Sequence, residues 1–185
     1  MGSHSLAALS RGRLRLSLVV VGLLLCILGI VLAVFVPTFI RRVRVNKISE
    51  ASELLQQMSD SASAYFATSW ADGKRFCLPP GAGPTPAMPT VDPATVDFAA
   101  KTESGRESWE ALGFQPDRPV RYSYSYAPDR HGCNLVGAGA LRSVSFRAEG
   151  DLDGDGVRSM FERRATMSAT GLEPDETLYV YRRVE

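Results

Sequence analysis

The sequence lacks the charge imbalance and the residue clusters on which many functions depend. Its 185 residues include 21 Lys or Arg and 20 Asp or Glu, so the formal net charge is only +1. Composition therefore gives no electrostatic basis for binding nucleic acid. Two histidines and three cysteines are present, with no spacing typical of a zinc site. No set of acid, base and nucleophile is recognisable, and we expect neither an enzyme nor a site for a small-molecule substrate.

What the sequence does have is one long apolar segment near its N-terminus. Residues 16–36 contain no charged side chain. As a helix this segment is about 30 Å long, the thickness of the hydrocarbon core of a bilayer. The apolar core of a cleavable signal peptide is shorter and ends in a small-residue cut site. We therefore expect a transmembrane helix over residues 16–40, surrounded by membrane lipid, and a disordered cytoplasmic N-terminus over residues 1–15.

The helical pattern continues beyond the apolar segment. Pro37 lies inside the pattern and predicts a kink rather than an end. After it, apolar residues recur mostly every three or four positions, while Glu50, Glu53, Gln57 and Asp60 lie mostly on the other faces. Residues 41–68 are thus predicted to be an amphipathic continuation of the same helix, on which the rest of the chain packs. The apolar positions are Ile40, Val43, Ile48, Ala51, Leu55, Met58, Ala62 and Tyr65.

Four basic residues open this amphipathic half. Two interpretations remain open: contact with anionic headgroups or with acidic residues of neighbouring subunits, or the ordinary solvated collar of a membrane helix. The basic residues are Arg41, Arg42, Arg44 and Lys47.

The remainder of the chain predicts an irregular region and then a sheet. Residues 69–119 hold much of the proline, with one helical turn expected over 107–112. Apolar and polar residues then alternate, or strand-forming residues cluster, in the runs 120–126, 144–148, 159–167 and 176–184. We expect an antiparallel β-sheet over residues 120–185. The predicted fold class is α+β, a long helix packed on a small antiparallel sheet.

Two cysteines of the soluble part, Cys77 and Cys133, are predicted to form a disulfide that ties the proline-rich region to the sheet. Neither has a neighbour at metal-ligand spacing. Arginines flank the apolar segment on both sides, so the positive charges do not orient it. A disulfide requires an oxidising compartment. We therefore expect a single-pass inner-membrane protein whose C-terminal domain is periplasmic or extracellular.

An acidic hairpin loop joins the second and third strand runs and matches the spacing D-x-D-x-D-G-x₅-E of a calcium loop. The matching residues are Asp151, Asp153, Asp155, Gly156 and Glu162. The flanking segments are predicted strands, whereas an EF-hand needs helices. We predict a Ca²⁺ site formed by the three aspartates and the backbone carbonyl of Val157, with Glu162 the less favoured ligand. The alternative is an Asp/Gly turn held by its own side-chain hydrogen bonds.

Together these features resemble the type IV pilin-like proteins, which include pilins and the pseudopilins of secretion systems. The resemblance rests on the apolar run that ends in residues 34–39, the basic residues after it, the long helix, the Trp109–Phe114 segment, the tyrosine run and the acidic loop. It implies a membrane-anchored, non-enzymatic structural subunit of a pilus or secretion-type envelope assembly. Other pilin-like subunits or the assembly machinery would contact its helix. The residues concerned are Leu16, Val20, Gly22, Pro37 and Phe39.

The processing signal of that family is degenerate here. Counting back from Pro37 places Arg15 where the family has the glycine that precedes the prepilin peptidase cut. Val20 stands where the family has a glutamate that pairs with a neighbouring subunit's N-terminal amine. The alternative is therefore a stand-alone single-pass envelope protein with a calcium-dependent extracytoplasmic binding domain.

Overall fold

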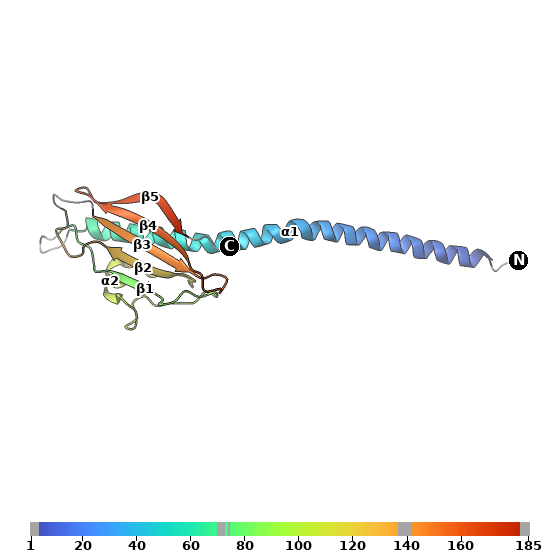
Figure 1. The fold of residues 1–185 in the computed structure, drawn as a ribbon, viewed down its shortest axis with the longest axis horizontal. Helices are drawn as coiled ribbons and strands as arrows, with labels where there is room; N and C mark the ends of the chain where they lie inside the picture. Colours follow the sequence, from blue (N-terminus) through green and yellow to red (C-terminus); the bar gives the residue numbers. More distant parts are fainter. Residues whose placement is uncertain (1–3, 70–72, 74, 137–141, 182–185) are drawn as a thin grey trace. The chain divides into compact units, whose positions relative to one another are not determined.

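The computed structural model describes residues 4–69, 73, 75–136 and 142–181, and within its long helix the side chains of residues 20–37 and from Ser49 onward. The chain divides into two compact units, Met1–Asn46 and Lys47–Glu185. From His4 onward the first unit is helical, and the second unit combines a helical segment with a sheet (Figure 1).

Helix α1 spans His4–Ala67 without interruption and contains Pro37, so one helix includes the apolar segment and its amphipathic continuation, as predicted. The predicted kink at Pro37 stays a prediction. In place of the disorder expected over residues 1–15, α1 starts at His4. Leucine, alanine and arginine dominate residues 6–15 and are strong helix formers, which accounts for the earlier start.

The second unit contains a five-stranded antiparallel sheet in the order β1-β2-β3-β4-β5, which establishes the α+β class. The strands are β1 (Ala82–Thr85), β2 (Ser123–Pro128), β3 (Ser143–Gly150), β4 (Ser159–Met167) and β5 (Leu172–Tyr181), with a short helix α2 (Arg106–Leu112). The third predicted run coincides with β4. Strand β5 begins earlier than its predicted run, 176–184, whose last three residues lie outside the described part. Strand β1 was not predicted, because its sequence, AGPT, contains two residues that usually interrupt strands.

The two edges of this sheet differ. Strand β1 is short and has Pro84 within it. Strand β5 is long but irregular: Arg163 pairs with Leu178 and Ala165 with Pro174, so β5 has extra residues opposite β4. The Asp175 carboxylate accepts hydrogen bonds from the Thr177 backbone N–H and the Tyr179 hydroxyl, both at 2.9 Å. These two bonds hold the bulge in place.

One hydrophobic core joins the buried side of α1 to the inner face of the sheet (Figure 1). Tyr122, Tyr124 and Tyr126 alternate into this core with almost no exposed surface, as the period-two pattern predicts. From α1 it includes Ala51, Leu54, Leu55, Met58, Ala62 and Phe66. Phe98, Trp109 and Phe114 close it beside β1, where the Trp109 indole N–H donates to the buried Thr85 hydroxyl at 3.1 Å.

Glu50 departs from its predicted position on the solvent side of the helix, because it is 5% exposed. Its Oε1 accepts from the Arg121 backbone N–H at 2.7 Å, and from the Tyr122 backbone N–H and the Tyr124 hydroxyl at 3.4 Å. Its Oε2 lies 3.4 Å from an Arg121 guanidinium nitrogen. These donors offset the cost of burying a carboxylate. The sequence pattern around Glu50 alone does not identify them.

We predict that Glu50→Ala lowers the free energy of unfolding by about 2–4 kcal/mol, because Arg121 and Tyr124 lose their buried acceptor. Glu53→Ala is the matched control. Glu53 pairs with Arg118 at 2.5 Å, but both side chains are about half exposed, and removing an exposed pair costs less than about 1 kcal/mol. Urea unfolding of the full chain in detergent measures both. Equal losses would contradict the central role of Glu50.

We also predict unfolding at alkaline pH. Burial, the largest cause, raises the pKa of Tyr122, Tyr124 and Tyr126 above 10.0, the ordinary value, and the nearby Glu50 charge adds to this for Tyr122 and Tyr124. A raised pKa in the folded state means that the stabilisation is complete below about pH 10 and is lost as the pH rises further. Circular dichroism and tyrosinate absorbance should therefore change together above that pH.

Tyr126→Phe separates this effect from packing. The Tyr126 hydroxyl is buried without a hydrogen-bond partner among the described residues, so its removal leaves the core filled. The variant should be at least as stable at neutral pH and should unfold at a higher pH than the unchanged protein. A lower alkaline midpoint would refute the explanation.

Candidate functional site

The acidic loop closes the β3–β4 hairpin, as the sequence predicts. The last paired residues are Gly150 and Ser159, and the loop occupies the residues between them. Leu152 is 4% exposed and fixes the loop to the core. Gly154 and Gly156 have φ angles of 78° and 84°, a conformation that other residues rarely adopt. Glycine at these two positions is what allows the chain to turn.

The three aspartates of the loop point their carboxylates toward a common region. Asp151 accepts from the backbone N–H groups of Gly154, at 2.9 Å, and Gly156, at 3.1 Å. Asp153 accepts from the Asp155 backbone N–H at 3.3 Å, and Asp155 from that of Val157 at 2.6 Å. These bonds pre-order the loop, and they are also what a self-contained Asp/Gly turn would show.

The three carboxylates lie close enough together that one metal ion could bridge them. One oxygen from each of Asp151, Asp153 and Asp155 lies within 4.8 Å of the others. Oxygens that share a Ca²⁺ ion at about 2.3–2.6 Å are separated by at most roughly 5 Å. Asp153 and Asp155 are exposed and Asp151 is half-buried, so an ion can reach them from solvent. The three aspartates would hold the ion. Val157, whose backbone carbonyl is the fourth predicted ligand, also lies in the loop and is about half exposed.

Glu162, the twelfth position of the calcium pattern, lies apart from this cluster. Its side chain is 3% exposed, and its two oxygens pair with Arg147 Nε at 2.9 Å and Arg164 Nε at 2.5 Å. Hydrogen bonding to Glu162 raises the pKa of Arg164, whose guanidinium lies 4.9 Å from the centre of the Tyr179 ring. Arg147 faces Glu162 across the β3–β4 register. The motif spacing cannot reveal this partner, because it depends on strand pairing.

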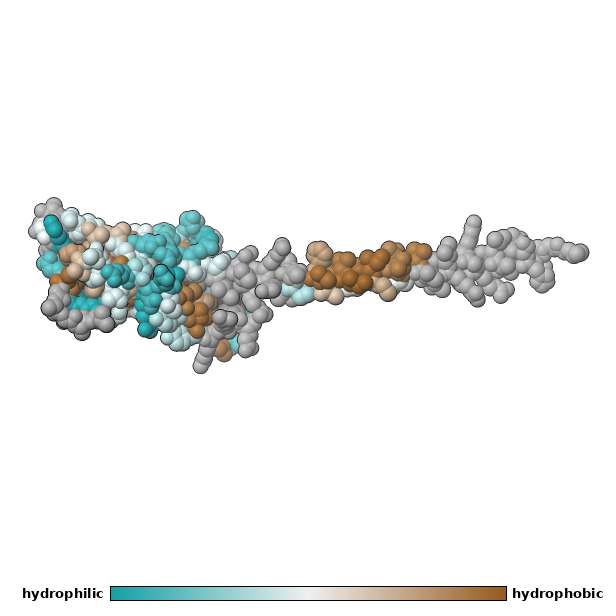
Figure 2. Space-filling model, turned by 90° about the horizontal axis from the view of Figure 1, so that it is seen from above, coloured by the Kyte–Doolittle hydropathy of each residue, from teal (hydrophilic) through white to brown (hydrophobic). Residues whose placement is uncertain are grey.

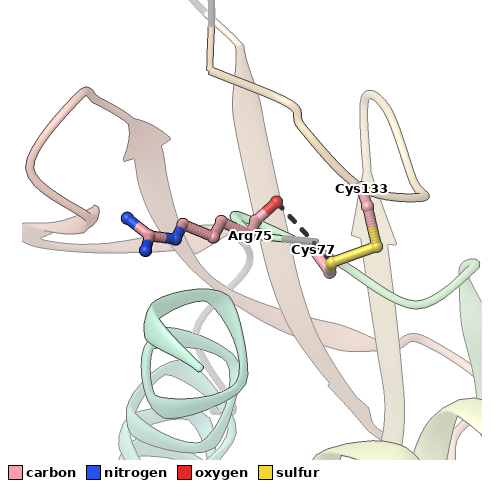
Figure 3. The surroundings of a disulfide bond; sticks show 3 residues. All are labelled: Arg75, Cys77 and Cys133. Carbon is pink, nitrogen blue, oxygen red and sulfur yellow. Dashed lines mark hydrogen bonds between the residues drawn. A yellow bond between two sulfur atoms is a disulfide. The ribbon is translucent and has the colours of Figure 1, made fainter. Parts of the chain in front are cut away.

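The predicted disulfide between Cys77 and Cys133 is present and links positions 56 residues apart (Figure 3). Next to it, Leu78 and Gly132 exchange two backbone hydrogen bonds of 2.9 and 2.8 Å. The Asn134 backbone N–H donates to the Arg75 carbonyl at 2.8 Å. Covalent and backbone bonds thus join the segment after α1 to the segment after β2.

The apolar part of α1 is long and apolar enough to cross a membrane over Val20–Pro37, with none of its surface buried. Figure 2 shows this part as a continuous hydrophobic surface. A signal sequence near the N-terminus has the same features. Gly22 has open space around it, and Val20 is 48% exposed.

Several predicted contact residues lie in α1 where only the backbone is described. Their helical conformation agrees with the prediction, but their side chains lie outside the described part. They are Leu16, Phe39, Arg41, Arg42, Arg44 and Lys47.

No known protein family, curated protein or solved structure matches this chain. Its interpretation therefore rests on its own residues and fold.

We predict that calcium raises the melting temperature of the full chain. Three carboxylates so close repel each other without a cation. An ion that binds only the folded state adds about 2.7 kcal/mol at a hundredfold excess over Kd, or roughly 5–10 °C for a chain of this size. Asp153→Asn should reduce this gain, whereas Asp117→Asn, an exposed site outside the loop, should leave it unchanged. If the melting temperature is the same with calcium and with chelator, and calorimetry detects no heat of binding, the loop is an Asp/Gly turn that does not bind calcium.

We predict that replacing the disulfide in the double variant Cys77→Ala/Cys133→Ala lowers the free energy of unfolding by about 4 kcal/mol, because the bond closes a long loop in the unfolded chain. Urea titration measures the loss. Alkylation and mass mapping of unreduced protein supply the independent check, in which Cys26 reacts and the other two cysteines stay protected. Free thiols at Cys77 and Cys133 would rule out the disulfide and the oxidising compartment with it.

Proposed function

We propose that this chain is a membrane-anchored, non-enzymatic, type IV pilin-like subunit of a pilus or secretion-type envelope assembly. The observation that carries the proposal is α1 itself: one helix supplies both an apolar segment long enough to cross a bilayer and the buried spine of a five-stranded antiparallel sheet. In this arrangement the lipid-embedded part anchors the subunit in the inner membrane, and the sheet domain is displayed on the periplasmic or extracellular side.

The outer side of α1 in the second unit supports association through the helix. Its exposed residues Glu53, Gln57, Asp60 and Ala64 recur every three or four positions and so share one face. Gln56 donates to Asp60 at 2.8 Å beside this face. A polar, small-residue face of this kind suits contacts between subunits that also meet water.

Two further features fit the same function. The Cys77–Cys133 disulfide is consistent with folding in an oxidising compartment outside the cytoplasm. Calcium on Asp151, Asp153 and Asp155 would offset most of the negative charge of the hairpin loop and stiffen the displayed domain. Neither role requires catalysis, and the sequence offers no catalytic set of residues.

The alternative function is a stand-alone envelope protein with a calcium-dependent binding domain. Arg15 and Val20 favour it, because the pilin-like resemblance calls for glycine and glutamate there. Without the glutamate, the bilayer segment carries no buried charge and gains no inter-subunit ion pair. The two functions differ in whether copies of α1 contact one another.

Cross-linking distinguishes them. We predict that Gln57→Cys, in a Cys26→Ser background, gives a ladder of multimers when native membranes are treated with a bifunctional maleimide, because Gln57 lies on the exposed face of α1. Ala169→Cys, in the exposed β4–β5 turn, is the control and should stay monomeric. If the Gln57→Cys variant gives only monomer, and the protein is still retained in carbonate-washed membranes, the result favours the stand-alone alternative.

The N-terminus of the native protein adds a second criterion. A start at Leu16 would indicate pilin-type processing despite Arg15, and a start near Met1 would indicate an uncleaved anchor. Arg15→Gly is the matched variant: it supplies the residue that the family's peptidase requires and should increase any cleavage at that position.

A further inference from the structure

The exposed apolar side chains of the second unit gather at one end of its sheet. Among the side chains described from Ser49 to Tyr181, five large apolar ones are between 37% and 61% exposed: Met88, Val91, Val157, Val180 and Tyr181. Single exposed apolar residues are normal on protein surfaces. Their concentration at one end is what calls for an explanation.

Strand register places three of them together. Val157 lies in the loop between the end of β3 and the start of β4. At the end of β5, Tyr181 pairs with Met160, and Val180 pairs with Phe161. Both partners lie at the start of β4, so Val180 and Tyr181 lie at the end of the sheet that carries the loop. The arrows of β3 and β5 point to this end in Figure 1.

Met88 and Val91 reach the same end from the proline-rich region. Met88 Sδ lies 3.0 Å from an Arg158 guanidinium nitrogen, in the segment between the loop and β4. A Cβ atom at Gly154 would lie 3.2 Å from Val91 Cγ2, so Val91 packs over the acidic loop. The five residues, with the loop that they surround, are called here the apolar end of the second unit.

The chain enters the second unit at the apolar end. The unit begins at Lys47, and three residues later Glu50 binds the Arg121 backbone N–H at 2.7 Å. The Arg121 carbonyl in turn accepts from the Thr90 N–H at 2.9 Å, between Met88 and Val91. The opposite end holds the β4–β5 turn, where Ala169 and Thr170 are exposed.

The connection to the candidate membrane segment is short. That segment ends at Pro37, and residues 38–46 separate it from the second unit. These nine residues extend about 14 Å as a helix and at most about 32 Å when fully stretched. If residues 20–37 cross a bilayer, the length of this connection limits the distance between the bilayer surface and the point, at the apolar end, where the chain enters the second unit.

We propose that the apolar end docks on the surface of the bilayer in which α1 is anchored, with Met88, Val91, Val157 and Val180 at the lipid interface and Tyr181 among the headgroups. This inference rests on the membrane anchoring in the proposed function. Tyrosine favours the interface because its ring is apolar and its hydroxyl is polar. Docking would remove the exposed apolar surface from water.

Charges of both signs lie near the proposed contact. The apolar side chains surround the loop of Asp151, Asp153 and Asp155, and the Arg158 guanidinium is paired with Glu149 at 3.3 Å. The connection to the candidate membrane segment and the first residue of the second unit supply four basic residues: Arg41, Arg42, Arg44 and Lys47. Because these cations offset the aspartates, docking is expected to depend on the apolar side chains and to need no anionic headgroup.

Depth-dependent quenching tests the proposal on the full chain. Val157→Cys in a Cys26→Ser background is labelled with an environment-sensitive fluorophore and reconstituted in phosphatidylcholine vesicles at very low protein-to-lipid ratio. Lipids with a nitroxide near the headgroup should quench the label at position 157. The same label at Ala169→Cys, at the opposite end of the sheet, should lose no fluorescence.

A second variant separates docking from mere proximity. Met88→Ser/Val91→Ser/Val180→Ser changes only exposed side chains, so the fold and the anchor remain, but the label at 157 should be quenched less. Carbonate washing reports the anchor independently of the apolar end.

The outcomes are distinct. If the protein is retained after the carbonate wash but the label at 157 is not quenched, the docking proposal is overturned and the membrane anchor is kept. If the wash releases the protein, both the docking and the membrane anchor are overturned. Equal quenching at 157 and 169, or equal quenching in the triple variant, overturns docking by these residues. Quenching at 157 that disappears as the protein is diluted in lipid shows that a second copy, rather than the bilayer, covers the apolar end.

Discussion

The buried carboxylate of Glu50 is the interaction on which the rest of the second unit depends. It brings a helical residue against the backbone of Arg121 and Tyr122, about seventy residues later in the chain. Apolar contacts alone would allow the helix to slide along the sheet, but a charge that requires particular N–H donors fixes one position. The core tyrosines then face the helix, and the Arg121 carbonyl is left to bind Thr90 of the proline-rich region.

The acidic side chains of this domain fall into two groups, which differ in burial and in the groups that compensate their charge. Glu50 and Glu162 are buried and satisfied by arginine and backbone donors, so they belong to the permanent framework. Among the described residues, the hydrogen bonds of the hairpin-loop aspartates come from the amides of their own turn, and Asp153 and Asp155 are exposed to solvent. Charge that is neutralised internally contributes to folding, and charge that is left at the surface is available to respond to ions.

Long-range periodicity made much of the fold predictable. The apolar segment, the single helix through Pro37 and the core-facing tyrosines follow from patterns that extend over many residues, and the β3–β4 hairpin follows from the Asp/Gly cluster between two strand runs. Strand β1 could not be predicted from the sequence, because its four residues, which include Gly83 and Pro84, show no alternation of apolar and polar residues. It forms a strand by pairing with Tyr124 and Tyr126 of β2. The burial of Glu50 and the partners of Glu162 could not be predicted either, because both depend on segments that are far apart in the sequence and meet only in the folded chain. The aspartate cluster was found because its residues are neighbours in the sequence.

Both borders of the sheet are poor templates for a further strand. At β1, Pro84 and the following Pro86 have no N–H to donate, and at β5 the bulge held by Asp175 interrupts the regular spacing of backbone groups. Copies of the domain at high concentration are thereby hindered from forming a continuous intermolecular sheet, the route by which β-proteins aggregate. Any contact between copies is then left to side chains, and it can be broken without separating a shared sheet.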